Sequence, residues 1–249
     1  MLLVELVIFL GMGEFYRMAE ARQLFAQRVA GTVFALVLGL ISFWGKPEYL
    51  LPSLVGFTLL VCSFQLFYQE LRLALITTGT TLLGVLYVGL LLSHIVLLRN
   101  WEGRAGHTDL GLFFIILVIA VTFLSDAGAF FVGRKWGKHQ LSPKISPKKS
   151  WEGALGAIVF GTLGAVLAKL IFDRWILATS LEWRHCFILG PILVVSAILG
   201  DLVESLFKRD AGIKDSGTII PGHGGILDRL DSIVFTVPVA YYYLKFIAY

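Results

Sequence analysis

The sequence predicts an all-α protein that forms a polytopic helix bundle in a membrane, and three observations lead to this fold class. Hydrophobic residues make up 57% of the 249 residues and charged residues only 15%, whereas soluble domains carry about 25% charged residues. The mean hydropathy is +0.81. Apolar stretches long enough to cross about 30 Å of hydrocarbon recur along the chain, and no hydrophilic block is long enough for a separate soluble domain. We therefore expect a single membrane domain over residues 1–249.

About eight apolar segments are expected to form transmembrane helices, because each is long enough to cross the hydrocarbon core. In chain order they span 2–19, 29–45, 49–69, 73–98, 108–133, 153–172, 185–207 and 230–248. The first segment contains Glu5 and Glu14. It has neither the basic region nor the small-residue cleavage site of a signal peptide, so we expect it to remain in the protein.

Basic residues are distributed unevenly among the connecting loops. Consecutive loops alternate across the membrane, so the loops 17–28, 70–72, 133–150 and 208–229 lie on one side. They hold 14 Lys and Arg residues, against 5 in the loops of the other side. By the positive-inside rule the first set is cytoplasmic and both termini lie outside. The alternative is that these bases only set the orientation and take no part in function.

Acidic side chains inside apolar segments gather in the C-terminal half of the chain. Asp201, Glu204, Ser205 and Lys208 are spaced at i, i+3, i+4 and i+7, which places them along one face of a helix. Asp126 lies in an earlier segment. An ionisable group inside a membrane helix is costly and therefore indicates a functional site.

Asp228 and Asp231 form a second pair, at i and i+3 beside the last apolar segment. Two helices that each carry such a pair can bring three or four carboxylates together, and these repel unless a cation lies among them or one stays protonated. Carboxylate oxygens suit Mg²⁺, which also binds water and substrate phosphates. The alternative is structural: Asp228 and Asp231 form ion pairs with Arg229 or Lys208 that join two helices.

The sequence "PGHGG", residues 221–225, lies between these two helices. Pro221 blocks helix continuation, whereas Gly222, Gly224 and Gly225 permit positive φ and close backbone approach. N–H groups in such a turn, at the start of a helix, form a site for anions. The turn is therefore expected to hold phosphates beside the carboxylates, and the alternative is an ordinary interhelical turn.

A second polar loop, "GRKWGKHQLSPKISPKKSWEG" at 133–153, carries six Lys and Arg residues and two Ser-Pro steps. It is not a P-loop, because its glycine spacing differs and no Ser or Thr follows Gly137 and Lys138. Its bases either clamp phosphates or are simply solvated.

Two stretches of the chain carry a family resemblance. "SLFKRDAGIKDSGTIIPGHGGILDRLD", from Ser205 to Asp231, contains S-x-x-K-R, K-D, P-G-H-G-G and D-R-x-D in order. It resembles the signature of the phosphatidate cytidylyltransferases, also called CDP-diacylglycerol synthases. "SDAGAFFVGRKWGKHQLSPKISPKKSWEG", from Ser125 to Gly153, is also similar to that family. The resemblance is strong over 121–235, which would hold the catalytic helices and cytoplasmic loops. Over 1–120 it is weaker and rests on hydropathy and on "GMGEFYRMAE".

The chain departs from the family at its N-terminus. Members usually have further hydrophobic sequence before the segment that corresponds to 2–19. This departure concerns the N-terminal topology and leaves the motifs intact.

The resemblance implies a reaction of phospholipid biosynthesis in which CTP and phosphatidate give CDP-diacylglycerol and pyrophosphate. It implies a homodimer among the lipids of the bacterial inner membrane, with its active site at the cytoplasmic face. It also implies Mg²⁺, with Mn²⁺ as a substitute, and K⁺ as a second ion. At pH 7 the lipid phosphate is largely a dianion, so this nucleophile needs no general base and the barrier is electrostatic.

The resemblance also implies roles for individual residues. Metal ligands are expected at Asp201, Asp228 and Asp231. Catalytic roles are expected at Lys208, Lys214, Arg229 and Asp228. Substrate-binding roles are expected at Asp126, Lys144, Lys149, Ser205, Arg209, Gly222, His223, Gly224 and Gly225.

Two other functions fit parts of the same pattern. A CTP-dependent lipid kinase, of the polyprenol or phytol type, would transfer the γ-phosphate to an alcohol. An ion transporter would use the intramembrane acids, but these gather near one face and do not follow a path across the membrane. Nucleic-acid binding is not expected, because the bases lie at a membrane face without a basic, aromatic-bearing soluble domain.

Overall fold

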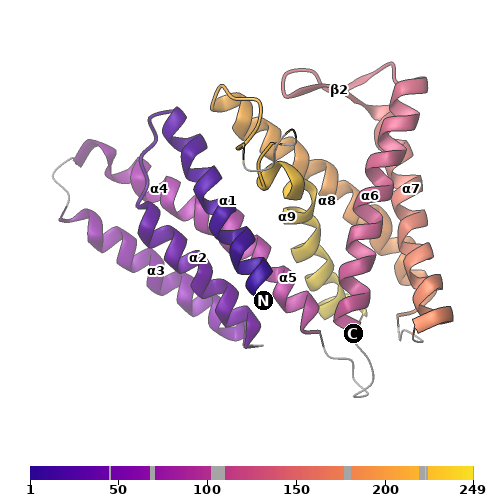
Figure 1. Cartoon of the computed structure of the whole chain (residues 1–249), viewed down its shortest axis with the longest axis horizontal. Coiled ribbons are helices and arrows are strands. Elements are labelled where there is room, and N and C mark those ends of the chain that lie inside the picture. The colour runs from indigo at the N-terminus through magenta and orange to yellow at the C-terminus, as the bar shows by residue number, and fades with distance from the viewer. Residues whose placement is uncertain are drawn as a thin grey trace. The chain divides into compact units, whose positions relative to one another are not determined.

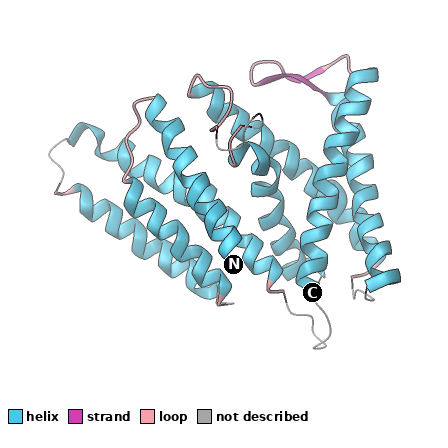
Figure 2. Cartoon of the chain, viewed as in Figure 1, coloured by secondary structure: helices cyan, strands magenta, loops and turns pink. Residues whose placement is uncertain are grey.

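The computed structural model describes residues 1–44, 46–67, 71–101, 110–176, 181–218, 222 and 224–248. Most of these residues are helical, as Figure 2 shows, which confirms the predicted all-α membrane fold. Within these ranges, six helical segments are long and apolar enough to cross a membrane: Pro47–Gln65, Ala74–Arg99, Leu110–Trp136, Trp151–Trp175, Trp183–Asp210 and Leu227–Ala248. Each of them overlaps a segment predicted from the sequence.

The first two predicted segments also form helices. Helix α1 (Leu2–Ala21) has 20 residues and includes several charged side chains, and helix α2 (Arg28–Phe43) is apolar but has only 16 residues. The predicted helices are therefore present, with ends that differ by a few residues. The outward orientation of the two termini stays a prediction.

The chain divides into two compact units. Unit 1 comprises Met1–Leu97 and Phe207–Leu230, and unit 2 comprises Leu98–Leu206 and Asp231–Tyr249. The helices α8 (Trp183–Asp210) and α9 (Leu227–Tyr243) each contribute residues to both units. That the whole chain forms one membrane domain stays a prediction.

In unit 1, helix α1 presents a buried face to its neighbours. Ile8, Met12 and Tyr16 on this face are almost completely buried. The Tyr16 hydroxyl donates a hydrogen bond to the carbonyl of Thr81, 3.1 Å away, so the polar tip of this buried ring is satisfied. The further helical elements of this unit are α2, the short turns Pro47–Tyr49 and Leu71–Leu73, α3 (Leu50–Gln65), α4 (Ala74–Gly84), the π-helical turn Val85–Leu90 and most of α5 (Leu91–Arg99).

In unit 2, small residues let the helices pack closely. Helices α6 (Leu110–Trp136) and α7 (Trp151–Ile171) lie side by side in Figure 1. A Cβ on Gly156 of α7 would lie 2.6 Å from Val132 of α6. Helices α8 and α9 approach similarly, since a Cβ on Gly200 would run into the carbonyl oxygen of Asp231. Close approach through small residues is typical of helices packed in membranes. The π-helical turns Phe172–Ile176 and Leu244–Ala248 follow α7 and α9.

The basic loop at 133–150 is more ordered than the sequence indicated. Helix α6 continues to Trp136, and the strands β1 (Gln140–Ser142) and β2 (Ser146–Ser150) then pair antiparallel. The Ser150 hydroxyl accepts a hydrogen bond from the N–H of Gly153 at 3.1 Å and caps α7. The Glu152 carboxylate accepts bonds from the N–H groups of Lys138 and His139. Because both ends of the hairpin are held, the lysines of β2 have defined positions.

Candidate active site

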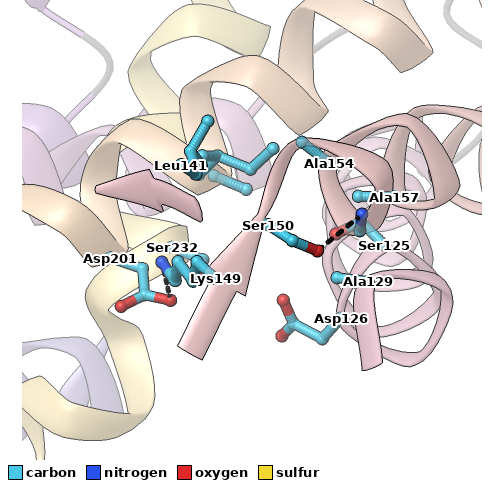
Figure 3. A pocket seen from close by; sticks show the side chains of 13 residues that line it. Ser125, Asp126, Ala129, Leu141, Lys149, Ser150, Ala154, Ala157, Asp201 and Ser232 are labelled. Carbon is cyan, nitrogen blue, oxygen red and sulfur yellow. Dashed lines mark hydrogen bonds and ion pairs between the residues drawn. The ribbon is translucent and has the colours of Figure 1, made fainter. Parts of the chain in front are cut away.

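A pocket of about 210 Å³ lies within unit 2, and charged side chains project into its largely apolar lining. Figure 3 shows Asp126 from α6, Lys149 and Ser150 from β2, and Asp201 from α8 around the same space. The remaining lining residues include Ser125, Ser232 and several small apolar side chains. Residues that the sequence separates by more than 70 positions thus meet, because the hairpin brings Lys149 of β2 to Asp201 of α8.

The charges in this pocket are linked to one another. The Lys149 ammonium forms an ion pair with one oxygen of Asp201, and the Ser205 hydroxyl donates to the other oxygen at 3.3 Å. Asp126 lies close enough to both Asp201 and Lys149 to interact with them electrostatically. The structure therefore brings together four residues that the sequence nominated.

The pocket is suited to a hard cation. Two carboxylates and one ammonium line the pocket, so the pocket carries a net negative charge when all three groups are ionised. The serine hydroxyls add neutral oxygens. A triphosphate would be repelled by these carboxylates unless a cation lay between. Mg²⁺ prefers one or two carboxylates together with water and phosphate oxygens. Asp126 and Asp201 therefore fit the metal that the resemblance implies.

The three aspartates that the sequence predicts as metal ligands are divided between the two units. Asp201 and Asp231 belong to unit 2, and Asp228 belongs to unit 1. Within the described ranges, no three His, Cys, Asp or Glu side chains are grouped closely enough to hold a metal ion. A metal role for Asp201, Asp228 and Asp231 stays a prediction.

Asp228 is the centre of a second cluster, which lies in unit 1. Its Oδ1 atom accepts a hydrogen bond from the Lys208 ammonium at 2.6 Å. Its Oδ2 atom accepts from the N–H of Ser216 at 2.8 Å and from the N–H of Gly225 at 2.7 Å, and it lies 2.9 Å from the Ser216 hydroxyl. Only 15% of the Lys208 side chain and 10% of the Asp228 side chain are exposed. The structural alternative, an ion pair between these two residues, is therefore present.

Glu14 of α1 completes this cluster, and the sequence analysis gave it no role. Its side chain is completely buried. Its Oε1 atom accepts from the N–H of Ile226, and its Oε2 atom accepts from the N–H of Leu227, each at 2.9 Å. The Ser216 hydroxyl lies 2.9 Å from Oε2 and shares its single proton between this oxygen and Asp228. Leu227 is the first residue of α9, so the Glu14 carboxylate binds the helix N-terminus, where an anion is favoured. The sequence did contain a sign of such a role, because Glu14 is an acid within a largely apolar segment.

The glycines of the 221–225 turn have the predicted backbone freedom. Gly222 and Gly224 adopt positive φ angles of 73° and 84°, and a Cβ on Gly225 would collide with the Ser216 hydroxyl and the Glu14 carboxylate. Pro221 and His223 lie outside the described residues, so the binding role predicted for His223 is not addressed.

Three N–H groups at this turn bind carboxylates of the chain itself. The N–H of Gly225 donates to Asp228, and those of Ile226 and Leu227 donate to Glu14. In this structure the N–H of Gly225 is therefore bound to Asp228. The binding roles of Gly222, Gly224 and Gly225 stay predictions.

The other predicted basic residues lie at the surface. Lys144 is exposed in the turn between β1 and β2, Arg209 is exposed near the end of α8, and Lys214 is exposed in the loop before Ser216. Arg229 is exposed in the first turn of α9. These side chains are accessible to a water-soluble substrate, and their roles stay predictions.

Comparison with known proteins identifies the group to which the chain is related. A family model described as "Cytidylyltransferase family" matches residues 1–247. The chain belongs to this family. The match confirms the resemblance seen in the two motif stretches and extends it to the weaker N-terminal part. The chain is therefore a polytopic membrane enzyme of the nucleotidyltransferase class.

Curated relatives of known name are also similar. A phosphatidate cytidylyltransferase from Synechocystis sp. is 36% identical, over 97% of this chain and 86% of the relative. One from Pseudomonas aeruginosa is 36% identical, over 96% of this chain and 84% of the relative. One from Haemophilus influenzae is 43% identical over a shorter stretch, which is 55% of this chain and 47% of the relative.

Proposed function

We propose that the chain transfers the cytidylyl group of CTP to phosphatidate, which forms CDP-diacylglycerol and releases pyrophosphate. The observation that carries the proposal is the similarity to two phosphatidate cytidylyltransferases over 97% and 96% of the chain. The charged pocket and the ion pair beside apolar helices support it, because such an enzyme must meet a lipid substrate and a water-soluble nucleotide together.

The chemistry would be a displacement at the α-phosphorus of CTP. An oxygen of the lipid phosphate forms the new P–O bond, and the bond to the β-phosphate breaks with pyrophosphate as the leaving group. The lipid phosphate is largely dianionic at pH 7, so no proton has to be removed. What the protein supplies is orientation and neutralisation of negative charge. Lys149 and Lys208, each held by an aspartate, and the exposed Lys214 and Arg229 are the cations proposed for this task.

Mg²⁺ is part of the proposal, and Asp201 with Asp126 are the residues that would hold it. Bound Mg²⁺ supplies positive charge to phosphate oxygens and lowers the repulsion between two anions. The same proposal includes Mn²⁺ as a substitute and K⁺ as a second ion. Removal of divalent ions by chelation should abolish turnover, and their addition should restore it.

Product analysis tests the function directly. Purified protein in detergent, given CTP labelled at the α-phosphate and phosphatidate, is expected to transfer the label to the lipid and to release unlabelled pyrophosphate. A lipid kinase would leave the label in CDP and would phosphorylate an added polyprenol or phytol. Labelled CDP together with a phosphorylated alcohol, or no transfer to phosphatidate at all, would contradict the proposal.

A cytoplasmic active site in the bacterial inner membrane is proposed from the charge asymmetry of the loops. In a variant without Cys62 and Cys186, a cysteine at position 144 should be shielded from a membrane-impermeant thiol reagent in intact cells. A cysteine at position 184, on the opposite predicted side, should react. Reaction at position 144 from outside would reverse the orientation and contradict a cytoplasmic site.

A homodimer is also proposed, on the family resemblance alone. Cross-linking in native membranes, followed by size analysis, is expected to give a species of twice the 27.5 kDa chain mass. A chain that stays monomeric at all cross-linker concentrations would contradict it.

A further inference from the structure

We propose that Glu14 of α1 is a positioning residue for cytidylyl transfer. It acts through Ser216 on Asp228 and, through Asp228, on the ammonium group of Lys208. The inference rests on the proposed function, because it assigns Glu14 to the residues that place Lys208 for a phosphate. It adds a residue from the N-terminal half to a reaction that the sequence assigned to 121–235.

The contacts form a continuous chain within unit 1. The Ser216 hydroxyl lies 2.9 Å from Oε2 of Glu14 and 2.9 Å from Oδ2 of Asp228. The other oxygen of Asp228 lies 2.6 Å from the Lys208 nitrogen. A displacement of the Glu14 carboxylate therefore changes where Ser216 lies. Ser216 holds Asp228 through its N–H and through a hydroxyl whose single proton is shared between Asp228 and Glu14.

The loop is closed tightly around this carboxylate. A Cβ on Gly217 would lie 2.5 Å from Oε1 of Glu14, and a Cβ on Gly225 would collide with Oε2. The backbone on both sides of the turn can thus approach Glu14 only because these residues are glycine. Burial of an ionised carboxylate is costly unless donors compensate for it, so an apolar side chain would be the simpler choice if Glu14 only filled space.

The hydrogen bonds to Glu14 require two acceptor oxygens, and a side chain of the same shape that lacks them cannot replace it. Oε1 accepts from the N–H of Ile226, and Oε2 accepts from the N–H of Leu227. In Glu14→Gln one of these positions becomes an NH₂ group, and either orientation of the amide points a donor at a backbone donor. The variant keeps nearly the same volume, so it tests the hydrogen bonds with little change in packing.

The first test is steady-state kinetics of Glu14→Gln. A displaced Lys208 should lower kcat about 10- to 100-fold, since an error of about 1 Å in placing a catalytic group has effects of this size. The KM values for CTP and phosphatidate should change much less. Glu5→Gln is the matched control. It lies on the same helix, and its buried carboxyl oxygens have no hydrogen-bond partner in the part of the chain that the structure describes. The control should turn over like the unaltered protein.

A double-mutant comparison separates positioning from simple loss of structure. If Glu14 acts through Lys208, then Glu14→Gln should lower kcat less than about twofold when Lys208 is already alanine, because coupled residues are not additive. Ser216→Ala removes the bridging hydroxyl but keeps its N–H, and it should also lower kcat and be non-additive with Glu14→Gln. If Glu14→Gln does not fold, the loss of kcat in Ser216→Ala serves as the test. The proposal would be overturned if the losses in kcat of the single variants multiplied in the double variants. Normal turnover in a folded Glu14→Gln or Ser216→Ala variant would also overturn it.

Hydrogen exchange gives a readout that does not depend on the reaction. The N–H groups of Ile226 and Leu227 should exchange faster in Glu14→Gln than in Glu5→Gln, because their acceptor is changed only in the former. If the unaltered protein transfers no cytidylyl group, the proposed function fails, whereas the exchange experiment still decides whether Glu14 holds the loop. Unchanged exchange at both positions would show that Glu14 does not hold it.

Discussion

Asp201→Asn is expected to lower cytidylyl transfer about 100- to 1000-fold, while the protein stays folded in its membrane. This is the effect of losing ~3–4 kcal/mol of electrostatic stabilisation of a transition state. The substitution removes the charge that pairs with Lys149 and that would hold Mg²⁺. It keeps an oxygen that can accept from Ser205, and it keeps the close approach of α8 and α9 at Gly200. The measurements are kcat and KM at saturating Mg²⁺, with thermal unfolding in detergent.

The two roles of Asp201 can be separated by its metal dependence. If Asp201 holds Mg²⁺, Asp201→Asn should raise the Mg²⁺ concentration needed for half-maximal turnover, whereas Lys149→Ala should not. If Asp201 only orients Lys149, both variants should lose activity at an unchanged Mg²⁺ requirement. Asp210→Asn on the same helix is the control, because its exposed ion pair with Arg22 is of a kind worth about 0–1 kcal/mol. Turnover of Asp201→Asn within about threefold of the unaltered protein would remove Asp201 from the site.

The helices were predicted well from the sequence because a long apolar segment in a membrane has few possible backbone structures. A segment such as 108–133 can satisfy its backbone in a membrane only as a helix, and α6 occupies Leu110–Trp136. The hairpin was not predicted. Two Ser-Pro steps and many bases indicate a loop, whereas the order of this segment comes from the Glu152 contacts and the Ser150 cap. The position of Lys149 beside Asp201 follows from that order.

The parts of the candidate site that the sequence left open depend on long-range contacts. Glu14 and Ser216 are 202 residues apart, so neither helical periodicity nor local spacing can pair them. The sequence left two roles open for Asp228, a metal ligand or the partner of a basic residue such as Lys208. An acid near the end of a helix is compatible with both. The structure shows the ion pair. Local spacing did predict that Asp201 and Ser205 share a helix face, and their hydrogen bond confirms it.

Lys208→Ala is expected to lower kcat by a factor of about 100 to 1000 and to affect stability less than Asp228→Asn does. If Lys208 neutralises phosphate charge, its loss costs transition-state stabilisation of ~3–4 kcal/mol. Asp228 would still accept its hydrogen bonds from Ser216 and Gly225 in this variant. In Asp228→Asn, by contrast, the ammonium of Lys208, whose side chain is 15% exposed, loses its ionised partner. Breaking a buried pair in this way costs about 3–5 kcal/mol, and partial exposure of both groups reduces that figure.

The comparison of these two variants distinguishes a phosphate-binding lysine from a purely structural ion pair. A structural pair joins α8 to the start of α9, so removal of either partner should lower the unfolding temperature by similar amounts and leave kcat of the folded fraction almost unchanged. A phosphate-binding lysine gives the opposite result for Lys208→Ala, with a large loss in kcat at nearly normal unfolding temperature. Lys148→Ala removes an exposed lysine on the same predicted side of the membrane and controls for the loss of one positive charge. Lys208→Arg keeps that charge but changes its position, so it should recover only part of the activity. If Lys208→Arg is fully active, then charge alone matters at this position, and the 2.6 Å contact with Asp228 does not serve to place Lys208 for catalysis.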